Sequence, residues 1–250
     1  MAQSSSIVLY DLAGGPPENP TKLTAPNPWK ARYALNFKGV DHRTEWVDLP
    51  DVPSVRQSLG VETKDKHPDG TPYYTLPILK DDNTGKLIGQ AFDIAVHLEK
   101  TYPNGPSLFP GGNIGLTAAF NDYIEALLSP FIVLNLDEFP FNPKTEKTSK
   151  AKLAARFGKK SWEDCLLRVD ARRELLVKFE AELEKLAGYF EATPGPFLQG
   201  GEAPTFADFI VGARLMALEC ALKEWDEVQT WHGGIWARLH RALAPWREVK

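Results

Sequence analysis

The sequence has few of the residues that would indicate a disulfide-rich or metal-binding protein. It contains only two cysteines in 250 residues. Cys165 and Cys220 lie far apart and form no Cys-x-x-Cys pair, so neither a disulfide framework nor a structural zinc site is expected. The five histidines also lack the spacing of metal ligands. We therefore expect no metal, and two reduced, buried thiols in a cytoplasmic protein.

Long apolar runs and an excess of positive charge are missing as well. No apolar stretch approaches the roughly 20 residues that cross a bilayer. Residues 1–6 lack the basic segment followed by an apolar one that marks a secretory signal. The formal net charge is −4, which gives no electrostatic reason to expect nucleic-acid binding. We expect neither a membrane nor a nucleic-acid partner. The 43% hydrophobic and 25% charged composition is that of a globular protein, long enough for two modest domains.

The most informative feature that the sequence does contain is the pair Leu76–Pro77. Pro77 interrupts an apolar, strand-like run over residues 74–79, where proline would remove a ladder hydrogen bond. A cis peptide bond explains a proline there, because it turns the chain and presents the N–H and C=O of Leu76 outward. Residues 81–85 then predict a hairpin loop, which is followed by a second short strand and by an amphipathic helix over 92–103. This order is typical of the peptide-binding corner of a thioredoxin-like fold.

The segments before this corner complete an alternating pattern. Residues 7–11 and 43–48 predict strands, and residues 53–59 predict a short helix. Asn27 followed by Pro28 indicates a helix start with Asn27 as the N-cap, and an apolar stripe that includes Trp29 continues to Gly39. The first hundred residues are therefore predicted to have the order β-α-β-α-β-β-α.

The second half of the sequence has a helical period throughout. Residues 103–112 have the composition of a linker, and the helix predicted from residue 114 is expected to kink at Ser129–Pro130. Thr205 and Asp208 form a capping-box pattern that opens another apolar helix. We predict two domains, an α/β thioredoxin-like domain over residues 1–103 and an all-helical domain over residues 113–250.

This organisation resembles a cytosolic glutathione transferase over nearly the whole chain. The finer resemblance is to the etherase-type glutathione transferases of wood-rotting fungi, which are similar to the bacterial lignin β-etherases. The segments that carry it are VLYDL at 8–12, PNPWKARYALNFKG at 26–39, DGTPYYTLP at 69–77 and IAVHLEKTYP at 94–103. The resemblance implies a homodimer and glutathione as co-substrate, with no metal.

The resemblance also implies which residues hold glutathione. The backbone of Leu76, before Pro77, would pair with the cysteinyl part, and the thiol would point at the N-terminus of the first helix, where positive charge favours thiolate. The implied catalytic donor is Asn27, with Thr24 as a second candidate. Alternatively, Asn27 only caps the helix, and Thr24 is only a polar residue of a loop. The implied glutathione-binding residues are Trp29, Leu76, Pro77, Gln90 and Ala91.

Two positions depart from the family pattern. Ala25 stands where a serine usually precedes the first helix, and Gln90-Ala91 stand where an acidic residue and a serine usually open the third helix. Both changes remove side chains that would touch glutathione. We therefore expect a site of preserved shape with weaker chemistry.

The residues after the predicted kink are candidates for a co-substrate pocket. Phe131, Asn135 and Phe139 combine apolar side chains with one amide, which suits an aromatic molecule. Ordinary core packing is the alternative for these residues. The first functional hypothesis is a glutathione transferase whose thiolate attacks an aromatic or β-aryl-ether electrophile. The alternatives are a non-catalytic binding protein for aromatic wood extractives, with a degenerate glutathione site, and a regulatory or interaction protein on the same fold.

Overall fold

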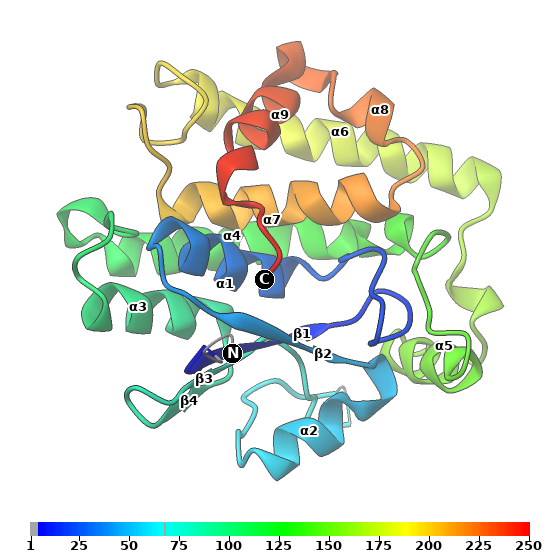
Figure 1. Ribbon diagram of the computed structural model, residues 1–250. Helices are drawn as coiled ribbons and strands as arrows, with labels where there is room; N and C mark the ends of the chain where they lie inside the picture. Colours follow the sequence, from blue (N-terminus) through cyan, green and yellow to red (C-terminus); the bar gives the residue numbers. More distant parts are fainter. Residues whose placement is uncertain (1–4, 68) are drawn as a thin grey trace.

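The computed structural model describes residues 5–67 and 69–250, and its N-terminal half is built on a four-stranded mixed sheet (Figure 1). The strand order is β2-β1-β3-β4. β1 pairs in parallel with β2 and antiparallel with β3, and β3 pairs antiparallel with β4. The strands are β1 (Ile7–Leu12), β2 (Arg43–Val47), β3 (Ile78–Asp81) and β4 (Lys86–Ile88).

Three helices complete this half and give it the predicted order. Figure 1 shows α1 and α3 on the face of the sheet that is turned toward the helical half, and α2 on the other face. These helices are α1 (Pro26–Phe37), α2 (Val52–Ser58) and α3 (Ala91–Thr101), with a 3₁₀ turn, η1 (Leu49–Asp51), before α2. The predicted β-α-β-α-β-β-α arrangement of a thioredoxin-like domain is confirmed.

The C-terminal half of the described chain contains helices and no strand. Its elements are η2 (Pro110–Gly112), α4 (Ile114–Leu128), η3 (Ser129–Asn135), α5 (Glu146–Arg156), η4 (Glu163–Cys165), α6 (Val169–Glu191), α7 (Phe206–Ala221), α8 (Trp225–Val228), α9 (Trp231–Ala242) and η5 (Ala244–Trp246). The expected kink within one helix at Ser129–Pro130 is wrong in detail, because α4 ends at Leu128 and a separate 3₁₀ helix, η3, begins at Ser129. No helix of the described residues is long and apolar enough to cross a membrane.

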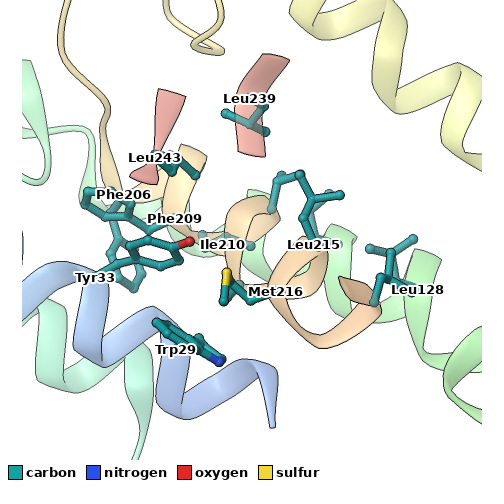
Figure 2. Close-up of a cluster of buried hydrophobic side chains, with 14 of the residues drawn as sticks. Trp29, Tyr33, Leu128, Phe206, Phe209, Ile210, Leu215, Met216, Leu239 and Leu243 are labelled. Atoms are coloured by element: carbon teal, nitrogen blue, oxygen red, sulfur yellow. The ribbon is translucent and has the colours of Figure 1, made fainter. Parts of the chain in front are cut away.

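The two halves share one continuous core, whose centre is the contact of α1 with α7. Figure 2 shows Trp29 and Tyr33 of α1 facing residues of α7. The ring of Tyr33 stacks on Phe209, with centroids 5.2 Å apart and planes 5° from parallel. The segment expected as a linker also contributes, since Leu108 and Phe109 are buried in this core. The linker is therefore part of the packing between the halves.

Several local predictions are confirmed and others are wrong in detail. The Leu76–Pro77 bond is cis, as expected, but β3 begins only at Ile78, so the proline precedes the strand rather than interrupting it. The Asp208 carboxylate accepts hydrogen bonds from the N–H (2.7 Å) and hydroxyl (3.0 Å) of Thr205, which confirms the capping box. Both cysteines are free thiols; one is buried, and Cys220 is only half-buried.

The prediction that Asn27 is an N-cap is wrong. The helix already begins at Pro26, so Ala25 occupies the N-cap position and Asn27 lies within the first turn. Proline fits the first helical position because its fixed φ is already helical and its missing N–H would have had no partner there. The Asn27 side chain therefore does not cap the N-terminus of the helix.

Candidate functional site

A cavity of about 420 Å³ lies between the two halves of the protein. The thioredoxin-like half contributes the start of α1 and the chain just before the cis-proline, and the helical half contributes α4, η3, α5 and α7. The predicted site residues on its wall are Thr24, Asn27, Leu76, Phe131, Asn135 and Phe139. The fold thus brings the proposed thiol-activating residues and the proposed co-substrate residues to one cavity.

The N-terminus of α1 offers an unusual set of donors to this cavity. Pro26 and Pro28 have no N–H, so Asn27 supplies the only backbone N–H among the first three helical residues. The Asn27 side chain forms no hydrogen bond with the described residues, and the same holds for the Thr24 hydroxyl. The Asn27 amide is therefore free to bind a ligand at the positive end of the helix.

The cis-proline corner forms the adjoining wall. Leu76 lies just outside β3, and its N–H and C=O have no hydrogen-bond partner among the described residues. Pro77 is buried behind Leu76 and does not reach the cavity surface. An exposed backbone N–H and C=O on a cavity wall can pair with an extended peptide as a neighbouring strand would.

A buried arginine holds this corner in place. The Arg56 guanidinium donates to the carbonyl oxygens of Thr75 (2.5 Å), Glu62 (2.6 Å) and Gly89 (3.1 Å), and Nε donates to that of Val61 (3.2 Å). These four acceptors satisfy a cation that is only 1% exposed. Arg56 thereby fixes the chain before Leu76 relative to the loop that leads into α3.

The start of α3 carries the polar groups nearest to this corner. Gln90 is the N-cap residue of α3, and its side-chain amide donates to the Asp65 carboxylate at 3.2 Å. The same carboxylate oxygen accepts from the hydroxyl of Thr75, whose residue lines the cavity, at 3.4 Å. Gln90 and buried Ala91 are not on the cavity wall. Sequence reasoning missed Asp65, because only the fold brings this polar loop to α3.

The structure places the Trp29 side chain in the core between the two halves. Its indole ring packs in the core beside Tyr33 (Figure 2), with ring centroids 5.6 Å apart. Trp29 is not among the residues that line the cavity. The indole N–H donates to the carbonyl of Leu23 at 2.8 Å, which fixes the loop before Thr24. Trp29 therefore lies behind the loop that leads to Thr24, off the cavity wall. The apolar stripe of this helix is the sequence signal for that placement.

The opposite wall is largely apolar and includes a helix that the sequence analysis missed. Besides Phe131, Asn135 and Phe139, residues of α5 also line this wall. These residues are Leu153 and Arg156 of α5 and Phe157, the C-cap residue of this helix. The Asn135 amide oxygen is buried without a hydrogen-bond partner in the described chain. This wall can accommodate an aromatic molecule and offers it one free amide.

A cluster of charged side chains, Lys30, Glu125 and Arg214, connects the two halves near the α1 N-terminus. Lys30 is 2% exposed and donates to Glu125 at 2.7 Å and to Asn121 at 2.8 Å. Arg214 of α7 donates to the other oxygen of Glu125 at 2.5 Å. Burial raises the pKa of Glu125, but the charges of Lys30 and Arg214 outweigh burial and hold that pKa below its ordinary value. The carboxylate is therefore ionised at neutral pH.

Comparison with known protein families gives two adjoining matches. Residues 24–101 match the N-terminal domain of glutathione S-transferases, and residues 115–246 match their C-terminal domain. The second match alone spans more than half of the chain. A search of curated proteins gave no match.

Solved structures of fungal origin are similar over the full length. A glutathione transferase of Phanerochaete chrysosporium has 30% identity, with 100% of each chain covered and a TM-score of 0.83. A glutathione S-transferase of Ceriporiopsis subvermispora, solved in complex with glutathione, has 31% identity, with 98% of each chain covered and a TM-score of 0.85. A β-etherase of Sphingobium has 17% identity over 96% of this chain and 98% of its own, with a TM-score of 0.57, and so shares the fold alone.

Proposed function

Because the chain belongs to the glutathione transferase family, we propose that it binds glutathione at the α1 N-terminus and transfers its thiolate to an aromatic electrophile, of which a β-aryl ether is one candidate. The thiol loses its proton to solvent on binding. The sulfur lone pair then forms a carbon–sulfur bond, and the leaving group departs with the electrons of the broken bond. The protein's contribution is to favour the thiolate, orient it and exclude water from the aromatic partner.

The observation that carries this proposal is the free Asn27 amide opposite an aromatic wall. Ala25 contributes no hydroxyl, so the thiolate would rely on Asn27, with Thr24 as a second donor. Hydrogen bonds to an anion are stronger than neutral ones and favour the ionised form. Phe131 and Phe139 would then hold the electrophile on the other side of the sulfur.

The remaining parts of glutathione have partners along the thioredoxin-like half. The unpaired N–H and C=O of Leu76 suit the cysteinyl backbone of the tripeptide. Asp65 suits the γ-glutamyl ammonium group, because its carboxylate lies between Gln90 and Thr75. In this arrangement Asp65 replaces the acidic residue that position 90 lacks. The glutathione complex of the Ceriporiopsis relative supports glutathione as the ligand.

The test is the pKa of the bound glutathione thiol, measured from the ultraviolet absorbance of the thiolate in the complex. Asn27→Ala should raise that pKa by about one unit, equivalent to about 1.4 kcal/mol, since one donor to the anion is lost. Asn104→Ala is the matched control, because Asn104 is exposed and lies off the cavity wall, and should leave the pKa unchanged. An unchanged pKa in Asn27→Ala would remove Asn27 from the mechanism.

A second candidate function is a binding protein for aromatic compounds on the same scaffold. Ala25 and Ala91, which provide no polar side chain, favour it. Conjugation of an aryl electrophile should be compared in the natural protein and in the Ala25→Ser, Ala91→Ser double variant. A large gain in rate would indicate that the chemistry has faded in this chain. An unchanged rate above background would indicate that the chain uses its own donors.

A further inference from the structure

Arg214 presents a partly unpaired cation at the cavity wall. Its Nη2 donates to Glu125 at 2.5 Å, its Nε is buried without a partner, and its Nη1 forms no hydrogen bond with the described residues. The side chain is only 11% exposed, and its Nε is buried, so water does not replace the missing partner of Nε. A buried guanidinium with free N–H groups is stabilised by an acceptor that carries negative charge.

The residues that line the cavity carry more positive than negative charge, because Arg156 and Arg214 face the single carboxylate of Glu125. Lys30 and Arg214 both pair with the carboxylate of Glu125, and Asp122, which lies off the cavity wall, is a further carboxylate close to Lys30. Glu125 is the only carboxylate among the described residues on the cavity wall, and the exposed Arg156 adds a further cation there. The positive end of α1 faces the same space. In a site of low dielectric these charges attract an anion more strongly than they would in water.

We propose that the aromatic molecule bound in this cavity is an aromatic carboxylate, and that Arg214 binds its carboxylate group. This inference rests on the proposed function, since it takes the cavity to be the co-substrate site. The apolar wall around Phe131 and Phe139 holds the ring. The free Asn135 amide oxygen accepts a hydrogen bond from a ring hydroxyl where one is present. Arg214 then acts as the residue that selects acids over their neutral counterparts.

The direct test compares two probes that differ in charge and little in shape. The affinities of 2-naphthoate and 2-naphthamide should be measured by calorimetry at neutral pH and low salt, without glutathione. The natural protein should bind the carboxylate about tenfold more tightly, equivalent to about 1.4 kcal/mol. In Arg214→Gln this preference should fall to within about twofold. Arg173→Gln removes an exposed arginine that lies off the cavity wall, and it should keep the full preference.

Two further variants separate Arg214 from its neighbours. Glu125→Gln removes the competing carboxylate, so it should increase the preference for naphthoate. Arg156→Gln should leave most of the preference in place, because its side chain is exposed. The proposal is overturned if the natural protein binds both probes equally, if Glu125→Gln reduces the preference, or if Arg156→Gln abolishes it while Arg214→Gln does not.

A glutathione titration of the same proteins distinguishes this proposal from the proposed function. If glutathione fails to bind while the naphthoate preference holds, the transferase proposal falls and Arg214 remains an anion-binding residue. If Arg214→Gln instead raises the pKa of the bound thiol and leaves the naphthoate preference intact, the partner of Arg214 is the thiolate, and the carboxylate proposal is wrong.

Discussion

Ionisation of Tyr33 should weaken the contact between α1 and α7 at alkaline pH. The Tyr33 side chain is 0% exposed, and its hydroxyl has no hydrogen-bond partner in the described chain. Burial raises the pKa of Tyr33 to about 12, although nearby Arg247 opposes the shift. The ordinary value is 10.0, so the folded protein keeps a proton that the unfolded chain loses between these two values.

The sign and size of the effect follow from this difference. Above pH 10 the unfolded state gains stability by ionising Tyr33, and the folded state does not until about pH 12. The favourable contribution of the neutral, buried tyrosine is complete below pH 10 and is lost as pH rises to 12. A shift of about two units corresponds to about 2.7 kcal/mol, as an order of magnitude.

Urea denaturation of the natural protein and of Tyr33→Phe, each at pH 9 and pH 11.5, isolates the contribution of Tyr33 ionisation to the free energy of unfolding. At pH 9 the variant should be as stable or slightly more stable, because it removes a buried hydroxyl with no partner. At pH 11.5 the variant should be more stable by about 2 kcal/mol, since other alkaline effects are common to both proteins. Equal loss of stability in the two proteins would refute the reasoning.

Three further outcomes are expected. Asp208→Ala leaves the N–H groups of Thr205 and Leu198 unpaired and should lower the free energy of unfolding by about 2–4 kcal/mol in urea titrations. Hydrogen bonds from His97 and Tyr102 outweigh burial and hold the pKa of Asp81 below its ordinary value. The ionised Asp81 therefore stabilises the fold above about pH 4, and this contribution is lost below it. Asp81→Asn should make the free energy of unfolding depend less on pH in this acid range, and an unchanged dependence would contradict this. Gly89→Ala places a Cβ 2.3 Å from Arg56 and should weaken glutathione binding several-fold in calorimetry. Asn104→Ala is the control for this variant, because a substitution at exposed Gly158 would strain a backbone with φ +66°.

The thioredoxin-like half was predictable because its signals are local. The cis-proline, hairpin loop and helix over 91–101 follow one another along the chain, and each has its own sequence signature. The capping box that opens α7 is equally local, and both of its members lie within three residues. Such features need no knowledge of tertiary contacts.

The polar residues of the site were missed because their roles depend on distant partners. Glu125 and Arg214 lie on different helices, far apart in sequence, and only packing brings them to Lys30. Asp65 reaches Gln90 in the same way. α5 was missed for another reason: its sequence, EKTSKAKLAAR, is mostly polar, and an exposed helix with few buried residues has little apolar periodicity.

The two prolines that open α1 have a consequence for what its N-terminus can bind. Helix N-termini hold phosphate groups by directing several backbone N–H groups at one anion with many oxygens. Pro26 and Pro28 remove two of those donors, and the Asn27 N–H and side-chain amide lie between them. The helix keeps its positive end while losing the multiple contacts that an oxyanion requires. With so few N–H donors, the start of α1 suits an anion whose charge lies on a single atom, such as sulfur, better than a phosphate with several oxygens.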